Sequence, residues 1–346
     1  MFRLRARLAV AANRTGLAHV IMRANARLPT AWQRLTVMTW HRVTTGLGAG
    51  FDRDVINASP EQFDREIAVL KEYYSLIGTA DLERYRVERK PLPPNPAMVT
   101  FDDGYRDCLT VALPILQKHH AKAVFFIPTG FMEERKLFWW ERISALIARS
   151  RRREIQLTYP GPLALSLADA DARHQAARRL FRVCKTQMQM DWALFLKGLA
   201  EACEVNWDKN TERGQADELI LDWNGVRALV EAGMDVQSHG ESHRILPTIT
   251  AEEVLREART SREVLQAQTG LPQYALAYPA GFGFPPGHPG YRAVEQAGYT
   301  MAFRFNGAAC RLGRISDWLN LPRLSSTPGM SEERFRGYLA FPNQLA

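Results

Sequence analysis

Residues 99–105 read VTFDDGY, an apolar, β-branched run that ends in two adjacent carboxylates and a glycine. A loop-like PPNP precedes the run, so residues 97–101 are predicted to form one short buried strand. Asp102 and Asp103 repel each other, and each loses hydration near a buried strand end. A simple turn is one explanation, because Asp-Gly is a strong hairpin signal. A bound cation that offsets the two charges is the other.

Strand and helix patterns alternate on both sides of this stretch. Ser59 followed by Pro60 marks the start of a helix, and similar helical patterns separate the other strand candidates. This rhythm predicts parallel β/α units. The strand candidates besides 97–101 are residues 35–40, 121–128, 234–238, 274–281, 299–303 and 320–326, with a short one at Leu76-Ile77.

Two segments depart from the rhythm. Residues 1–34 form a basic amphipathic arm, and residues 35–346 form the α/β domain. From about 133 to 222 the domain is interrupted by a mainly helical insertion, in which REIQLTYP (153–160) is the only strand-like part.

The charge of the chain is concentrated at its N-terminus. Of 45 basic residues, eight arginines precede Asp52 and no acidic residue does, which leaves 37 basic and 37 acidic residues in the remainder. A neutral body argues against nucleic-acid binding. The arm has three interpretations: a helix resting on an anionic membrane face, a helix packed on the domain with solvated arginines, or a transit peptide.

Cysteine usage and hydropathy suggest a location. The four cysteines have no CxxC spacing, so they are interpreted as ordinary thiols in a reducing compartment. No apolar run in the arm is long enough for a signal-peptide core or a membrane span. We therefore expect a cytoplasmic protein, with the inner face of the membrane as the place of any peripheral contact.

A second polar strand end lies at residues 235–244, DVQSHGESHR. His239 and His243 are predicted to lie in a loop there, because Gly240 disfavours a helix. Two histidines and one carboxylate form a three-ligand site with an open position, which is typical of a catalytic zinc. A polar loop without metal is the alternative. A zincin HExxH motif is excluded, because it would need glutamate at position 240.

The polar candidates all follow strand candidates. His41, the Asp102-Asp103 pair, the two loop histidines and the turn at 278–281 each do so. Active sites of α/β barrels gather at the carboxyl ends of strands, so we expect these residues to converge. The other five histidines are expected to be structural.

Three of these stretches carry a resemblance to a known family. TFDDGYRDCLTVALPILQKHHAKAVFFIPTGF, GMDVQSHGESHRIL and AYPAG resemble the motifs of the NodB-type polysaccharide deacetylases, over roughly residues 35–132 and 219–325. The resemblance implies a distorted (β/α) barrel and one divalent metal ion, most simply Zn²⁺. It also implies that Asp102 is the general base and that Asp103, His239 and His243 hold the metal.

The chain departs from the family pattern in three places. Gly240 replaces the usual serine or threonine, Ala277 replaces the arginine that normally pairs with the catalytic aspartate, and no convincing Leu-x-His motif exists. A subgroup with Tyr-Pro-x-Gly in the third motif takes its acid histidine from the first strand, and VMTWHRV fits that pattern. By this resemblance His41 is the general acid. Three further residues are expected to contact the substrate, the oxyanion or the catalytic carboxylate: Tyr278, Ala280 through its N–H, and Arg323.

The implied activity is removal of an N-acetyl or related acyl group from a polysaccharide, oligosaccharide or lipid-linked sugar, as in exopolysaccharide biosynthesis. One alternative is a zinc amidase acting on a non-carbohydrate amide. The other is a catalytically silent barrel that binds carbohydrate or membrane. Three tryptophans are candidates for stacking on a sugar or for core packing: Trp139, Trp140 and Trp318.

Overall fold

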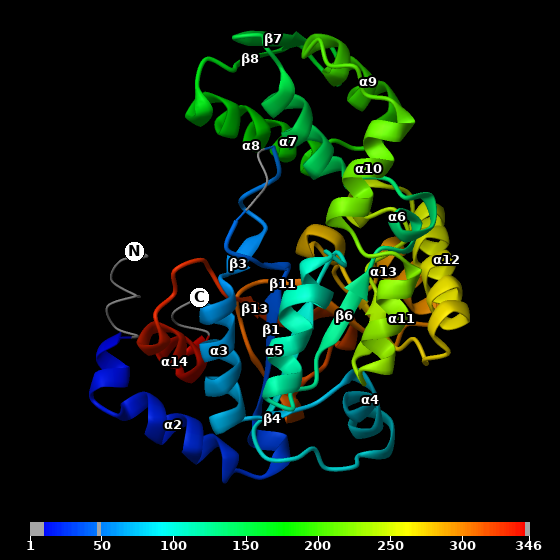
Figure 1. The fold of residues 1–346 in the computed structure, drawn as a ribbon. Coiled ribbons are helices and arrows are strands. Elements are labelled where there is room, and N and C mark those ends of the chain that lie inside the picture. Colours follow the sequence, from blue (N-terminus) through cyan, green and yellow to red (C-terminus); the bar gives the residue numbers. More distant parts are fainter. Residues whose placement is uncertain (1–9, 47–49, 343–346) are drawn as a thin grey trace.

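A computed structural model describes residues 10–46 and 50–342 and contains a closed barrel of seven parallel strands (Figure 1). The expected α/β barrel is therefore confirmed. Each strand is short and mostly buried, as the apolar runs predict, and only β11 ends in two exposed residues. The barrel strands are β1 (Arg34–Trp40), β5 (Pro96–Phe101), β6 (Val124–Ile127), β9 (Asp235–Ser238), β10 (Ala275–Ala277), β11 (Met301–Phe305) and β13 (Leu321–Ser325).

The barrel closes between its first strand and two others that are far apart in the sequence. β1 pairs with β5 on one side, with Thr39 opposite Thr100, and with β13 on the other, with Thr39 opposite Ser325. Around the barrel the order is β1, β5, β6, β9, β10, β11 and β13. Two short strands add to the barrel sheet, β4 (Ser75–Leu76) beside β5 and β12 (Cys310–Arg311) beside β1. Two others form a separate two-stranded sheet: β2 (Arg42–Val43) and β3 (Ile56–Ala58).

Helices pack around the outside of the barrel (Figure 1). The predicted start of the first is confirmed, because the Ser59 hydroxyl accepts a hydrogen bond from Gln62 N and Pro60 is the first helical residue. A π-helical turn at Cys108–Ala112 leads into α5. The helices of the barrel are α3 (Pro60–Tyr73), α4 (Thr79–Glu88), α5 (Leu113–Lys118), α6 (Thr129–Glu134), α11 (Trp223–Glu231), α12 (Ala251–Thr269), α13 (Pro289–Gln296) and α14 (Glu332–Ala340).

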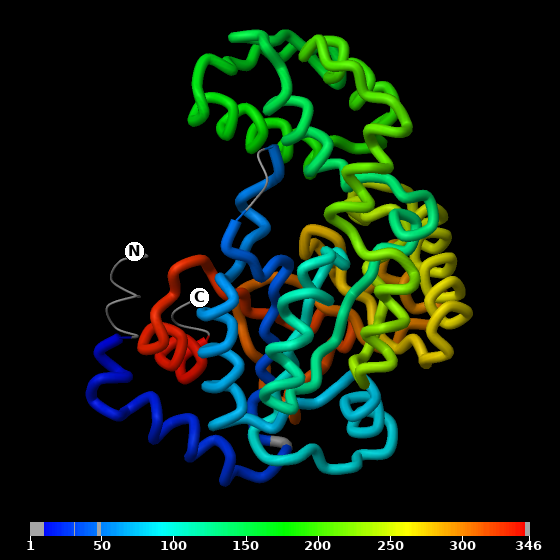
Figure 2. The backbone as a smooth tube through the Cα atoms, in the orientation of Figure 1, coloured from blue at the N-terminus to red at the C-terminus, as the bar shows by residue number. Residues whose placement is uncertain are grey.

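A lobe formed by residues 139–219 stands above the carboxyl ends of the strands (Figures 1 and 2). It consists of α7 (Trp139–Arg149), α8 (Ala170–Thr186), α9 (Trp192–Ala202), α10 (Lys209–Leu219) and a hairpin. The prediction of a single strand-like stretch here is wrong, because β7 (Glu154–Leu157) pairs antiparallel with β8 (Leu163–Ser166). The second strand is a four-residue run whose partner lies across a turn, so its own pattern is too short to be recognised.

The N-terminal helix α2 (Leu17–Ala26) packs at the foot of the barrel beside α14 (Figure 1). Ala18 and Met22 are buried, and the His19 ring is 2.7 Å from the Tyr73 hydroxyl. The part of the arm before residue 10 lies outside the described residues. No helix of the described chain is long and apolar enough to cross a membrane.

The barrel interior is apolar near its foot and polar near its top. Phe126 and Phe303 meet across it at 5.6 Å between ring centroids, and the Arg323 guanidinium lies 5.7 Å from the Phe126 ring. A second aromatic cluster, which includes Trp40 and Phe63, packs between the barrel and α3. The interior positions of each strand therefore alternate with positions that face the helices, which fixes the side on which each strand-end residue lies.

Candidate active site

The Asp102-Asp103 pair lies directly after β5, at the top of the barrel. Asp102 N donates to Trp40 O at 3.0 Å and so continues the strand pairing, whereas Asp103 has a left-handed φ of 71° and leaves it. Gly104 follows with φ 72°, and a Cβ there would lie 2.9 Å from Ile127 Cδ1. This turn sends two adjacent carboxylates to different partners, which a regular hairpin would not require.

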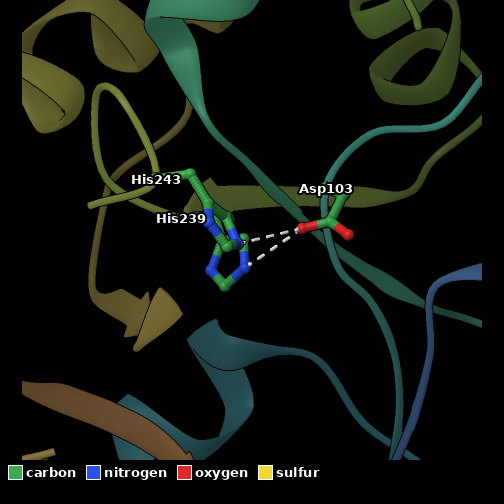
Figure 3. Close-up of side chains that lie close together, drawn as sticks. All are labelled: Asp103, His239 and His243. Atoms are coloured by element: carbon green, nitrogen blue, oxygen red, sulfur yellow. Dashed lines mark ion pairs between the residues drawn. The ribbon is translucent and has the colours of Figure 1, made fainter. Parts of the chain in front are cut away.

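Asp103 faces the two loop histidines (Figure 3). Its Oδ1 lies 3.4 Å from His239 Nε2 and 3.3 Å from His243 Nε2, and all three side chains are buried. One atom from each residue falls within 4.8 Å of the others, so the three could hold a metal ion. The structure thus brings together the three residues that the sequence pattern pointed to.

The donor set fits a divalent metal. Among the residues that the structure describes, the buried Asp103 Oδ1 has no hydrogen-bond partner, so this oxygen is free to bind a cation. Two ligand atoms about 2.1 Å from a tetrahedral zinc ion would be roughly 3.4 Å apart, which matches the separations of Asp103 Oδ1 from the two Nε2 atoms. His239 Nδ1 lies 2.8 Å from Ala277 O, a contact that holds the proton on Nδ1 and leaves Nε2 free to bind.

Asp103 and His243 favour the protonation states that a metal needs, whereas His239 would have to release a proton when a metal binds. Burial alone would raise the pKa of Asp103, but the adjacent imidazoles of His239 and His243 lower it well below its ordinary value. Burial lowers the pKa of His243 and so favours its neutral imidazole, which is the form that binds a metal ion. The pKa of His239 is raised, because the charges of Asp102 and Asp103 outweigh the effect of its burial.

The histidine loop is held by a buried carboxylate from α12. Glu257 accepts hydrogen bonds from Glu241 N at 3.1 Å and Ser242 N at 2.9 Å, and also from the Ser242 hydroxyl. Gly240 has φ 81°, a conformation that glycine adopts without strain. The backbone of this loop explains why glycine replaces the hydroxyl residue that the family usually has there.

Asp102 forms a bidentate ion pair with Arg323. Two guanidinium nitrogens lie 2.7 Å from the two carboxylate oxygens, and both side chains are only about 2–3% exposed. Burial would raise the pKa of Asp102, but the charges of Arg323 and His239 and the hydrogen bonds from Arg323 lower it below its usual value. β13 thus supplies the cation that Ala277 on β10 cannot.

His41 lies at the end of β1, on the same side as Asp102. Its Nε2 is 3.9 Å from Asp102 Oδ2, and about a third of the side chain is exposed. Asn57 Oδ1 accepts a hydrogen bond from His41 N at 2.6 Å and lies 3.3 Å from the ring Nδ1. The sequence analysis did not predict a role for Asn57, since no motif or pattern around this residue indicates one. The structure therefore places one imidazole beside the cavity, next to the carboxylate.

Of the two site residues predicted in the turn after β10, only one lines the cavity. Ala280 lines the cavity and has a left-handed φ of 55°. Tyr278, expected to contact the substrate, is instead fully buried against Phe284, 6.1 Å between ring centroids, and its side chain does not line the cavity. Side chains alternate along β10, so Tyr278 faces α13 while Ala277 faces the barrel interior. We therefore withdraw Tyr278 as a substrate contact.

The candidate site residues at the strand ends line a cavity of about 560 Å³: His41, Asp102, Asp103, His239 and His243. Its roof comes from the lobe, and it includes Trp139 and Trp140, which are both nearly buried. Trp140 lies 4.5 Å from the His243 ring and donates to the Tyr105 hydroxyl, so it supports a candidate ligand. Trp318 packs beside Tyr85, away from the cavity. A second cavity, of about 620 Å³, contains none of the predicted site residues.

The fold and the site together define a (β/α)-barrel protein with an Asp-His-His ligand set and a buried carboxylate beside it. The sequence profile of the family described as polysaccharide deacetylase matches residues 89–158 and 174–302, more than half of the chain. The chain belongs to the polysaccharide deacetylase family. Membership of the family supports carbohydrate deacetylation as its activity.

Solved structures show the same fold at low sequence identity. A Streptococcus pyogenes deacetylase, PplD, in complex with acetate is 17% identical, with a TM-score of 0.56 over 89% of this chain and 97% of that chain. IcaB from Ammonifex degensii is 16% identical, with a TM-score of 0.53 over 90% and 97%. The BpsB deacetylase domain from Bordetella bronchiseptica is 14% identical, with a TM-score of 0.52 over 87% and 98%. No curated protein sequence matches the chain.

Proposed function

We propose that the protein is a divalent-metal-dependent hydrolase that removes an N-acetyl group from a sugar within a polysaccharide, oligosaccharide or lipid-linked glycan. The observation that carries the proposal is the separation of two roles at one strand end. Asp103 faces His239 and His243, whereas both carboxylate oxygens of Asp102 pair with Arg323. The donor set suits Zn²⁺, although other divalent ions accept the same ligands.

A metal bound by these three residues would lower the pKa of its water and polarise the acyl carbonyl. Asp102 takes the proton from the attacking water, and Arg323 keeps that carboxylate ionised and fixed in orientation. His41, whose imidazole is oriented by Asn57, donates a proton to the departing amine. The Ala280 N–H donates to the oxyanion. Each of the two proton transfers typically contributes a factor of about 10²–10⁴ to the rate.

The displaced histidine and the relocated arginine support membership of the subgroup with a Tyr-Pro-x-Gly motif. In this proposal His41 does the work of the absent C-terminal histidine, and Arg323 does the work of the arginine missing at Ala277. The chemistry of the site stays complete although two of its residues come from other strands.

Two other functions use the same barrel. A zinc amidase acting on a non-carbohydrate amide would need the same metal site, and only the cavity lining would differ. A silent carbohydrate-binding module would retain the fold without turnover. The bidentate Asp102–Arg323 pair favours an enzyme, because a buried charge pair is costly to keep and binding alone does not need it.

The test is acetate release from N-acetylglucosamine oligomers by the zinc-loaded wild type, compared with Asp102→Asn and His41→Ala. We expect a loss of at least about 10²-fold in kcat for each variant, with metal content retained. His288→Ala is the matched control, because this histidine caps α13 and stacks on Phe284 but does not line the cavity. No acetate release by the metal-loaded wild type from any N-acetylated glycan would reject the proposal, and release from simple amides alone would favour the amidase.

We also propose that the protein works in the cytoplasm and that α2 contacts anionic membrane there. Leu17, Val20 and Trp32 are about half exposed, at 48%, 60% and 57%, and the exposed arginines Arg23 and Arg27 lie among them. Apolar side chains beside cations suit an anionic bilayer surface. The site lies at the other end of the barrel (Figure 1), so this contact would not itself present a lipid-linked substrate.

Flotation with vesicles tests the membrane contact. We expect the protein to float with phosphatidylglycerol-containing vesicles but not with pure phosphatidylcholine, and Val20→Glu to abolish flotation. Val87→Glu, at an equally exposed valine on α4, is the control and should have no effect. Equal flotation of the Val20 variant would contradict the proposal.

A further inference from the structure

The roof of the catalytic cavity is a helix from the lobe, and its lining is basic. Five residues of α8 line the cavity together with the residues at the strand ends: Arg178, Phe181, Arg182, Lys185 and Thr186. The three cations follow one another at intervals of four and three positions, which places them on one face of the helix. They therefore face the same space as Asp102 and the candidate metal ligands.

The neighbouring apolar face of α8 packs against α7 and keeps this orientation fixed. Leu180 and Cys184 are buried there, and the Phe181 ring lies 5.9 Å from Trp139. Arg179 belongs to a different face of the helix, since it does not line the cavity and its side chain donates to Ala164 O at 3.4 Å. The helix thus separates cations that face the cavity from one that does not.

The carboxylates of the cavity are already engaged. Asp102 is paired with Arg323, and Asp103 faces the two imidazoles. Asp54 lies 3.4 Å from Arg178 Nε and 3.8 Å from a histidine of α8, and Asp52 accepts a hydrogen bond from the backbone N–H of Asp54.

Two cations remain available. Within the described residues, Arg182 and Lys185 have no ion-pair partner within 4.0 Å, and both are exposed to the cavity. Asp52 is the remaining carboxylate in the lining: burial raises its pKa, and the charge of Lys185 acts in the opposite direction, but no ion pair within 4.0 Å joins Asp52 to Lys185. A bound divalent ion would make the cavity more positive still.

We infer that the substrate carries an anionic group, a phosphate ester or a carboxylate, and that Arg182 and Lys185 bind it while the acyl group lies at the strand ends. This inference rests on the proposed function and gives its substrate class: an acidic glycan or a sugar phosphate. A guanidinium offers two parallel N–H donors to such a group, and an ammonium adds a flexible point charge. A neutral glycan would leave both cations unused.

Calorimetry with three ligands that lack an acyl group tests the inference without turnover. Methyl glucoside is neutral, glucose 1-phosphate carries a phosphate ester, and methyl glucuronide carries a carboxylate. We expect the zinc-loaded wild type to bind at least one anionic ligand ten or more times more tightly than methyl glucoside, and the stronger of the two identifies the group. The double variant Arg182→Gln/Lys185→Gln should lose this preference, whereas Arg179→Gln should keep it. Metal content is measured in every sample, because phosphate also binds metal.

Equal binding of neutral and anionic ligands by the wild type would overturn the inference, as would a preference that persists in the double variant. Acetate release separates this result from the proposed function. A protein that deacetylates neutral oligomers but shows no anionic preference contradicts the inference alone. A protein that shows the preference, and loses it in the double variant, but releases no acetate contradicts the proposed function alone.

Discussion

Replacing Arg323 should change both the pH profile of the enzyme and the stability of the fold. In Arg323→Met the Asp102 carboxylate stays buried and loses both of its 2.7 Å contacts to the guanidinium. Burial, which already acts to raise the pKa of Asp102, is then opposed mainly by the charge of His239. A carboxylate that loses a cation at this range typically gains about 1–3 pKa units.

The sign of the effect follows from the direction of the shift. In the wild type the folded state lowers the pKa of Asp102, so this group stabilises the fold above its unfolded pKa and loses that contribution as the pH falls. One pKa unit corresponds to about 1.4 kcal/mol, and removing one member of a buried ion pair costs about 3–5 kcal/mol. We therefore expect Arg323→Met to be destabilised by a few kcal/mol near neutral pH and by less in acid.

The assay is the pH dependence of kcat/KM for acetate release, with urea unfolding at the same pH values. The acidic limb should move up by about 1–3 pH units in Arg323→Met. It should move by less in Arg323→Lys, which keeps the positive charge but not the two parallel N–H donors of the guanidinium. Arg304→Met, at an exposed position on the neighbouring β11, is the control. An acidic limb that stays in place in a folded Arg323→Met protein would refute the role assigned to this pair.

Three further predictions concern groups around the site. Burial raises the pKa of Glu141 to about 8, so the folded state retains a proton that the unfolded state releases near pH 4.5. Between these two pH values the stability of the wild type should therefore fall relative to that of Glu141→Gln by roughly 1.4 kcal/mol per pH unit. Parallel urea-unfolding profiles of the two proteins would contradict this prediction. Gly240→Ser should lower the free energy of unfolding by about 1–2 kcal/mol without loss of metal. The left-handed φ of 81° is strained for serine, whereas a Cβ has room, since its nearest atoms would be 3.6 and 3.8 Å away. An unchanged melting temperature would exclude backbone strain. Glu257→Gln should weaken zinc binding about 10–100-fold in a chelator competition, because the loop that carries His243 loses part of its anchor; unchanged affinity would show that the loop holds its shape alone.

Local patterns predicted the barrel because each of its units is local. The strand expected at residues 35–40 is β1, the helix expected after Ser59 is α3, and the histidine loop follows β9 without a helix. Each is encoded within a few residues by burial alternation, a cap or a glycine. The convergence of Asp103, His239 and His243 followed from one general rule about the carboxyl ends of parallel strands.

Features that depend on distant partners were harder to predict. Arg323 and Asp102 are 221 positions apart, and only the closure of the barrel by β13 brings them together. The resemblance suggested this arginine because a family position was vacant, and its bidentate geometry was not foreseeable. The face that α8 turns to the cavity depends on how the lobe docks, which its sequence does not state. Tyr278 was misassigned because motif position alone does not give the direction of a side chain on a three-residue strand.

The measurement that tests the central claim most directly is the metal content of the purified wild type beside Asp103→Ala and His239→Ala, by elemental analysis after reconstitution with zinc. The account predicts about one zinc ion per chain in the wild type and in the control His288→Ala, and close to none in the two ligand variants. Absence of zinc from the reconstituted wild type, or one ion per chain in folded Asp103→Ala and His239→Ala, would contradict the assignment of these residues as the metal site.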